Sequence, residues 1–164
     1  MSAQDSKLFV ISGPSGAGKG TLVTRVRERR SNLGLTVSAT TRAPRKGEVD
    51  GVNYFFLTRE EFDRRVANGE FVEWAEVHGN CYGTLVSEVT SKLASGSSLI
   101  LEIDVQGALQ VKERFPEAVL IFIKPPSLEV LRERLVGRGT ETPETIELRM
   151  ANAADELALA DRYD

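Results

Sequence analysis

The stretch GPSGAGKGT at residues 13–21 constrains the fold more than any other part of the sequence. It follows an apolar run at residues 8–11 and precedes a segment in which apolar residues recur with helical spacing. Glycines in such a loop allow positive φ and a close approach to an anion, and the following helix adds positive partial charge. The order of strand, glycine loop and helix predicts a phosphate-binding P-loop, rather than a glycine-rich turn with a solvated lysine.

One position departs from the usual P-loop pattern. Serine or threonine normally follows the lysine directly, but here Gly20 follows Lys19 and Thr21 comes next. We therefore expect Thr21 to reach Mg²⁺ through water rather than directly. The residues expected to surround nucleotide phosphates are Gly13, Pro14, Ser15, Gly16, Ala17, Gly18, Lys19, Gly20 and Thr21.

Composition narrows the class of protein. The chain has 164 residues, of which 41% are hydrophobic and 27% charged, which suits one domain with room for small insertions. A net charge of −3 disfavours a broad nucleic-acid surface. Cys81 is the single cysteine, residues 1–7 are polar, and no apolar run approaches membrane-spanning length. We expect a cytoplasmic protein without a signal peptide and without membrane or nucleic-acid partners.

Apolar strands alternate with helices over most of the chain. Strands are expected at residues 8–12, 98–104 and 118–123, and helices at residues 21–30, 86–95, 107–115, 127–137 and from residue 143 onward. Strands separated in this way by helices predict an α/β fold with a doubly wound parallel sheet.

The segment from residue 35 to residue 84 breaks that alternation. It holds short strand-like runs at residues 35–38, 54–56 and 71–77, a glycine- and proline-rich stretch at residues 39–51, and a helix that opens with a capping box at Thr58. We interpret it as an inserted subdomain of mixed β structure with one helix.

Asp104 ends the second central strand, at the sheet edge where ligands of such folds bind. In a P-loop protein, an acid at this place is typical of the element that holds Mg²⁺ or its water shell. The alternative is a strand-ending aspartate that caps the next helix. The P-loop in the same chain favours the metal-related role.

The pattern SxTTRxPRxGExxGxxY covers residues 38–54. Arg42 and Arg45 lie three residues apart in a loop braced by proline, so both guanidinium groups can converge on one phosphate. The hydroxyl of Tyr54 can add a neutral donor. The alternative is a solvated basic loop.

The P-loop, the 38–54 pattern, FVEWA at residues 71–75, YGT at 82–84, LEIDVQG at 101–107 and RLxGRGT at 134–140 occur in this order. Together they resemble guanylate kinase, the enzyme family that phosphorylates GMP with ATP, over nearly the whole chain. The resemblance implies an ATP- and Mg²⁺-dependent kinase for GMP and also dGMP, with a mobile lid. The rival interpretations are a non-catalytic guanylate-kinase-like module that binds phosphopeptides, disfavoured by the intact P-loop, and a P-loop kinase for another acceptor, disfavoured by Glu73.

The resemblance also implies roles for individual residues. ATP is expected at the P-loop, Arg134 and Arg138. The phosphate of GMP is expected at Arg42, Arg45, Tyr54 and Tyr82, its guanine at Ser38, Glu73 and Thr84, and Glu102 and Asp104 are implied acids near GMP and Mg²⁺. The catalytic set is Lys19, Arg42, Asp104, Arg138 and Arg149, although Arg149 alone would suggest an exposed helix arginine paired with a glutamate.

The implied organisation has three parts. Residues 1–34, 85–134 and 150–164 form the core, residues 35–84 the GMP-binding subdomain, and residues 135–149 the lid. In the family a last strand, a final helix and part of the adenine site follow the match to residues 163–164, so we expect weak ATP binding if Asp164 is a true terminus. The sequence leaves open whether the protein is a monomer or a homo-oligomer.

Overall fold

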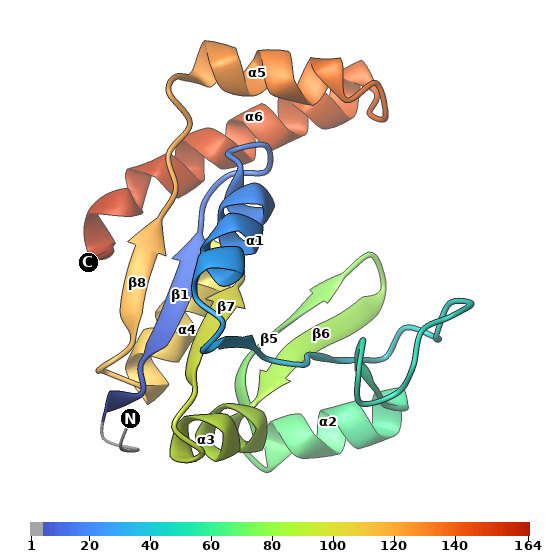
Figure 1. Cartoon of the computed structure of the whole chain (residues 1–164). Coiled ribbons are helices and arrows are strands. Elements are labelled where there is room, and N and C mark those ends of the chain that lie inside the picture. Colours follow the sequence, from blue (N-terminus) through green and yellow to red (C-terminus); the bar gives the residue numbers. More distant parts are fainter. Residues whose placement is uncertain (1–4) are drawn as a thin grey trace.

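The computed structural model describes residues 5–164, which form two four-stranded sheets (Figure 1). The first sheet is entirely parallel and has the order β2-β7-β1-β8. Its strands are β1 (Leu8–Ser12), β2 (Leu33–Leu35), β7 (Ser98–Glu102) and β8 (Val119–Phe122). The α/β fold with a doubly wound parallel sheet is therefore confirmed. Residues 1–4 of the polar N-terminal stretch lie outside the described residues.

Helices cover both faces of this sheet. On one face, α3 (Val86–Ala94) and α4 (Val105–Arg114) pack on alternate strand residues such as Val10 and Leu99. On the other face, α1 (Lys19–Arg29) packs on the intervening residues, among them Ile11 and Ile100. Both faces of the central strands β1 and β7 are thus buried, which explains their continuous apolar sequences.

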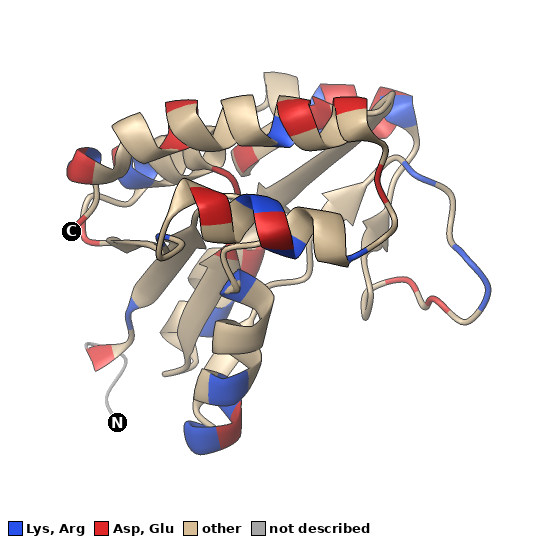
Figure 2. Cartoon of the chain, turned by 90° about the horizontal axis from the view of Figure 1, so that it is seen from above, with Lys and Arg blue, Asp and Glu red and all other residues tan. Residues whose placement is uncertain are grey.

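Two further helices lie across the end of the sheet from which α1 starts (Figure 1). They are α5 (Leu128–Gly137) and α6 (Pro143–Ala158), followed by the short 3-10 helix η2 (Ala160–Arg162). Ser127 and Thr142 cap α5 and α6, and the side chain of each accepts a backbone N–H three residues on. Both charge signs occur along this pair of helices (Figure 2). Among residues 5–164, none of the helices has the length and apolar character required to span a membrane.

The second sheet is mixed and has the order β4-β3-β6-β5. Its strands are β3 (Ala39–Thr40), β4 (Phe55–Phe56), β5 (Phe71–Val77) and β6 (Asn80–Leu85). The helix α2 (Arg59–Ala67) begins after Thr58, whose hydroxyl accepts the N–H of Glu61. Mixed β structure with one helix, expected for this part of the chain, is what the structure shows.

Some element bounds differ from the sequence-based expectation. The strand expected at residues 35–38 is instead β2, which pairs with β7 in the parallel sheet, with Leu35 opposite Ile100. Gly34 lies within β2, where a Cβ would stand 3.2 Å from Leu99 Cδ2. The helix α4 begins at residue 105 rather than 107, because Asp104 caps it.

The two sheets have separate apolar cores that meet at β5. The register of β5 against β6 shifts between Phe71 and Glu73, which marks a β-bulge at Val72. Val72 packs in the core of the parallel sheet with Val89 and Val111, whereas its neighbour Phe71 packs in the core of the mixed sheet. The bulge therefore lets consecutive residues of one strand serve both cores.

Candidate active site

The P-loop joins β1 to α1 with the backbone geometry that its glycines predict. Gly13 has φ 151°, and a Cβ there would lie only 2.4 Å from the carbonyl oxygen of Ile123. Gly18 has φ 98° and stands at the N-cap of α1 without a side-chain cap. The N–H groups of the first helical turn therefore face the loop without an internal acceptor, as an anion-binding site requires.

Lys19 folds back over this loop. Its ammonium donates to the carbonyl oxygens of Gly13 and Pro14, the second at 3.2 Å. Burial lowers the pKa of Lys19, while the carboxylates of Glu102 and Glu156 act to raise it. The cation is thus held by acceptors of its own loop and faces two acids.

Two cavities beside the P-loop bring most of the expected phosphate ligands together. One, of about 320 Å³, is lined by Lys19, Thr21, Glu102 and Arg138 together with the loop backbone. The other, of about 560 Å³, adds Arg134 and the α1 residue Arg25. Glu102 is the last residue of β7, so these cavities lie at the carboxyl end of the parallel strands.

Two arginines of the α5–α6 pair contact the P-loop directly. Arg134 Nη1 donates to the carbonyl oxygen of Gly16 at 3.2 Å. Arg149 Nη1 donates to Ser15 Oγ at 3.0 Å, and its Nε lies 2.8 Å from Glu141 Oε1. Arg149 is therefore both paired with a glutamate, as its sequence alone would suggest, and placed at the P-loop, as the family resemblance implies.

Asp104 caps α4, which was the alternative to a metal-related role. Its Oδ1 accepts the N–H of Gly107 at 2.8 Å, and its backbone carbonyl accepts Ser12 Oγ at 3.4 Å. The carboxylate also lines a cavity of about 180 Å³ together with Glu156. Capping engages one carboxylate oxygen and fixes the group two residues beyond Glu102, so the capping geometry is compatible with both roles.

Arg42 lies in a cluster of aromatic and acidic side chains at the second sheet. Its Nη1 and Nη2 donate to the two carboxylate oxygens of Glu48, both at 2.9 Å, and its guanidinium lies 5.2 Å from the ring centre of Tyr54. The rings of Tyr54 and Tyr82 are 6.2 Å apart. Arg42, Tyr54 and Tyr82 are therefore brought together, whereas Arg45 is exposed and meets Glu48 through its backbone N–H at 2.7 Å.

Glu48 is a residue to which the sequence-based reasoning gave no role. The hydrogen bonds from Arg42 and from the Arg45 backbone lower its pKa to about 2, and the same carboxylate raises the pKa of Arg42. The glutamate stands within the 38–54 pattern, but spacing in a loop does not say which charges will pair. Only the folded loop reveals that an acid already occupies the fork of Arg42.

Glu73 and Thr84 form a buried pair across β5 and β6. Thr84 Oγ1 donates to Glu73 Oε1 at 2.8 Å, and the two residues are 0% and 8% exposed, respectively. Burial is the main cause that raises the pKa of Glu73, and the nearby Asp104 raises it further. Ser38 is half-buried at the start of β3, where its carbonyl accepts the N–H of Phe55 at 2.8 Å.

Gly107 is where the two halves of the site meet. A Cβ at this position would lie 3.1 Å from Glu73 Oε2 and 3.0 Å from Asp104 Oδ1. The absent side chain therefore lets the acid of the second sheet and the acid of the parallel sheet approach the same helix N-terminus.

Two more acids near the P-loop escaped the sequence-based reasoning. Glu156, on α6, is half-buried and faces Lys19 and Asp104, and burial raises its pKa. Glu141 precedes α6 and pairs with Arg149. Both follow ordinary helical or loop sequence, so no local signal marks them, and only the packing of α6 over the P-loop brings them to the site.

Comparison with known proteins adds an independent line of support. Residues 5–164 match the sequence profile of the family described as guanylate kinase. A guanylate kinase of Gloeobacter violaceus is 58% identical over 159 residues, covering 97% of this chain and 78% of the relative. A guanylate kinase of Halalkalibacterium halodurans is 54% identical over 164 residues, covering 100% of this chain and 80% of the relative.

A solved structure agrees with these sequence relatives. The crystal structure of guanylate kinase from Anaplasma phagocytophilum superposes with a TM-score of 0.67 at 38% identity, covering 97% of this chain and 74% of that one. Family profile, sequence relatives and structure all match along almost the full length of the described residues. The chain therefore belongs to the guanylate kinase family.

Proposed function

We propose that this chain transfers the γ-phosphoryl group of ATP to GMP, giving ADP and GDP, and that it also accepts dGMP. The observation that carries the proposal is the meeting at Gly107 of Glu73 with Asp104, at the sheet edge that also bears the P-loop. The residues proposed to bind the purine and the loop proposed to bind the triphosphate would thus belong to one site. A module that only bound phosphopeptides would have no use for the P-loop and Lys19.

Guanine recognition rests on Glu73. Guanine presents two neighbouring donors, its N1–H and 2-amino groups, and an ionised carboxylate can accept both. The hydroxyl of Thr84 already donates to one oxygen of Glu73, which fixes the carboxylate in its plane. Ser38, half-buried at the rim of the same sheet, offers a further hydroxyl to the purine edge.

The phosphate of GMP would bind to the cluster formed by Arg42, Tyr54 and Tyr82. Arg42, Tyr54 and Tyr82 are gathered on one side, and the exposed Arg45 can turn toward the same anion. Glu48 holds Arg42 in place before GMP arrives, which lowers the entropy lost on binding. The phosphate of GMP is itself the nucleophile, so the reaction needs no general base.

On the ATP side, positive charge gathers where the transferred phosphoryl group would lie. Lys19, Arg138 and Arg149, with Arg134 beside them, come from the P-loop and from the α5–α6 pair. Phosphoryl transfer depends mainly on positioning and on neutralising charge spread over the equatorial oxygens. These side chains would hold that charge in the transition state.

The donor set at the sheet edge fits Mg²⁺, which prefers oxygen ligands and keeps several waters. Thr21 and Glu102 line one cavity at this edge and Asp104 lines a neighbouring one, and Thr21 and Asp104 would hold the ion through water. When bound with ATP, the ion would neutralise phosphate charge.

We further propose the following division of labour. Residues 1–34, 85–134 and 150–164 act as the core, residues 35–84 bind GMP, and residues 135–149 act as the lid, with residues 1–4 outside the described part. The protein would work in the cytoplasm on ATP and GMP, without a nucleic-acid partner. Mixed charge along the helices of Figure 2 agrees with small-molecule substrates rather than a polyanion.

A coupled assay of ADP release tests the proposal directly. ATP and Mg²⁺ are supplied with each of GMP, dGMP, AMP, CMP and UMP in turn. Turnover with GMP and dGMP is expected, with little or none for the others. Absence of ADP release with every monophosphate, together with binding of a phosphorylated peptide, would identify the chain as a non-catalytic module instead.

A further inference from the structure

We propose that Glu141 is a positioning residue that holds the guanidinium of Arg149 in place against the P-loop; the inference rests on the proposed kinase function. The carboxylate of Glu141 lies 2.8 Å from Arg149 Nε, while Arg149 Nη1 reaches Ser15 Oγ at 3.0 Å. The planar guanidinium of Arg149 thus has contacts at two of its nitrogens, with the carboxylate of Glu141 at Nε and with the P-loop at Nη1.

The geometry of the guanidinium explains why two contacts matter. Nη1 donates a hydrogen bond to Ser15, whereas the contact of Nε with Glu141 is an ion pair, because the Nε–H has no hydrogen-bond acceptor among residues 5–164. The five N–H donors lie in one rigid plane, so a hydrogen bond at one edge and the attraction of a carboxylate at another together orient the whole group. The side chain of Arg149, on α6, is long and flexible and would otherwise sample many rotamers. The Glu141 contact therefore selects the rotamer in which Arg149 faces the P-loop.

Glu141 is buried to a degree that is uncommon for an acid. It lies in the connection between α5 and α6, after Gly139 with φ 65° and directly before the α6 cap Thr142. Its side chain is only 11% exposed, and its Oε2 is buried without a hydrogen-bond partner among residues 5–164. Burying a carboxylate that is incompletely satisfied costs stability, so its presence beside the P-loop arginine points to a functional task.

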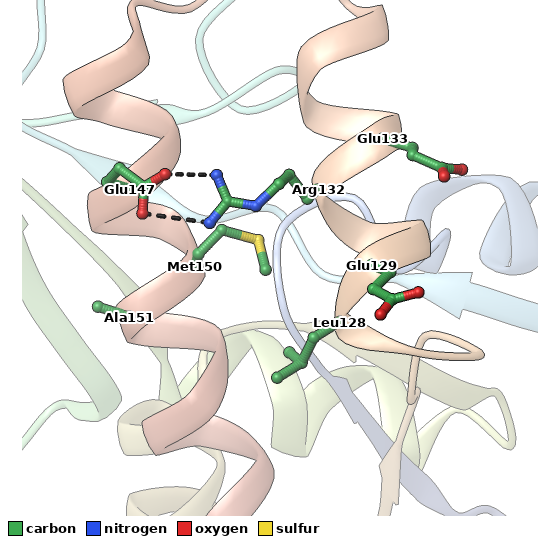
Figure 3. Close-up of a pocket in the computed structure, with 7 residues that line it drawn as sticks. All are labelled: Leu128, Glu129, Arg132, Glu133, Glu147, Met150 and Ala151. Atoms are coloured by element: carbon green, nitrogen blue, oxygen red, sulfur yellow. Dashed lines mark hydrogen bonds and ion pairs between the residues drawn. The ribbon is translucent and has the colours of Figure 1, made fainter.

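A second ion pair between the same two helical regions provides a contrast. Arg132 of α5 donates to both carboxylate oxygens of Glu147 on α6, and their side chains are 46% and 65% exposed (Figure 3). This pair lines a groove of about 680 Å³ together with Leu128 and Met150, none of which belongs to the P-loop cavities. The Arg132–Glu147 pair therefore joins the helices without touching the site, and Glu147 is a matched control for Glu141.

The first test compares Glu141→Ala with Glu147→Ala in the ADP-release assay with GMP. Glu141→Ala is expected to lower kcat by about tenfold to a hundredfold, because misplacing a charge-stabilising group weakens the transition state. KM for GMP should stay within about twofold, since Arg149 contacts Ser15 of the P-loop and not the Arg42 cluster proposed to bind GMP. Glu147→Ala should lower kcat far less than Glu141→Ala does, and thermal melts of both variants identify any loss of fold.

Two further variants separate positioning from simple support. Glu141→Asp keeps the charge on a shorter arm and should recover part of the lost kcat, whereas Glu141→Gln, which keeps the shape without the charge, should not. In a double-mutant cycle, Glu141→Ala should cost little more once Arg149→Lys is present, because the two residues act as a unit. The cycle can be completed with Glu141→Gln if the alanine variant does not fold.

The possible outcomes are distinct. A folded Glu141→Ala protein with wild-type kcat, or one whose effect adds fully to that of Arg149→Lys, would overturn the positioning role. Equal losses in Glu141→Ala and Glu147→Ala would mean that helix pairing alone is responsible and would also overturn it. Failure of the wild-type protein to release ADP with any monophosphate would instead count against the proposed function.

Discussion

The P-loop and the Arg42 cluster are both suited to binding an anion, but the P-loop uses backbone groups and the Arg42 cluster uses side chains. In the P-loop, backbone geometry does most of the work: Gly13 and Gly18 take positive φ and the first turn of α1 presents its N–H groups. In the Arg42 cluster, side chains do it: a guanidinium is held by Glu48 beside two tyrosine rings. The P-loop depends on glycines that lack a Cβ, whereas the Arg42 cluster depends on contacts between neighbouring side chains.

The difference predicts which kind of substitution disrupts the P-loop and which kind disrupts the Arg42 cluster. A backbone site fails when a Cβ is added, because the chain can no longer take the required path. A side-chain site fails when a partner is removed, because the remaining group turns away or loses its charge balance. The backbone site is also indifferent to which nucleotide carries the phosphate, so selectivity must come from the second sheet.

The largest expected effect tests that last point. The wild-type protein should prefer GMP over AMP by about 10⁴ or more in kcat/KM, because adenine would leave the buried Glu73 carboxylate facing an unprotonated ring nitrogen. Glu73→Gln should lower kcat/KM for GMP by about a hundredfold and leave the weak use of AMP little changed. Comparable wild-type rates with AMP and GMP would show that the second sheet does not select the base.

The next effect concerns the cation of the backbone-built site. Lys19→Met should lower kcat by about a hundredfold or more, since its charge is needed where negative charge spreads in the transition state. The fold should survive, because the hydrogen bonds of the Lys19 ammonium go to carbonyl groups of its own loop. The measurement is steady-state kinetics with circular dichroism as the folding control. Near-normal turnover would mean that the loop backbone suffices alone.

A glycine pair then compares the two regions directly. Gly13→Ala should destabilise the protein by about 3 kcal/mol, from positive-φ strain together with the clash on the Ile123 carbonyl. Gly47, within the 38–54 pattern that contains Arg42 and Arg45, also has positive φ but open space around it. Gly47→Ala should therefore lower the free energy of unfolding by only about 1 kcal/mol. Urea unfolding of the two variants measures both values. Equal losses would show that space around the backbone is not what distinguishes the P-loop.

The smallest effect is a pH dependence in the side-chain-built site. The pKa of Glu48 is lowered from 4.5 to about 2, chiefly by Arg42. An acid with a lowered folded-state pKa contributes stability that is complete above its unfolded pKa and is lost as the pH falls through its folded pKa. The difference in Tm between wild type and Glu48→Gln should therefore be constant above about pH 5 and shrink between pH 4.5 and about pH 2. A difference that stays constant through this range would contradict the pairing with Arg42.

Much of the fold could be predicted from sequence because local chemistry decides it. The P-loop glycines, the caps at Thr58, Ser127 and Thr142 and the strand β5 lie where their patterns predict. The short strand β2 was misplaced, because three residues carry little periodicity and its position depends on pairing with β7. Strand pairing is a tertiary property and leaves almost no trace in so short a segment.

The candidate site divides in the same way. Lys19 and Arg42 stand in recognisable patterns, and in the structure Lys19 contacts a carbonyl of its own loop and Arg42 lies beside Tyr54. Glu48, Glu141 and Glu156 could not be foreseen, because their importance comes from residues that approach only after folding. Acids are common on surfaces, so a sequence cannot distinguish a buried counter-charge from a solvated one.

The bulge at Val72 has a consequence for how the molecule unfolds. Phe71 packs in the core of the mixed sheet, and the next residue, Val72, packs in the core of the parallel sheet. Unfolding of either core therefore displaces β5 and removes a residue from the other core. Calorimetry should accordingly record one heat-absorption peak, with a calorimetric enthalpy equal to the van't Hoff value, although the chain contains two sheets. Two sheets that share consecutive residues of one strand thus form a single cooperative unit.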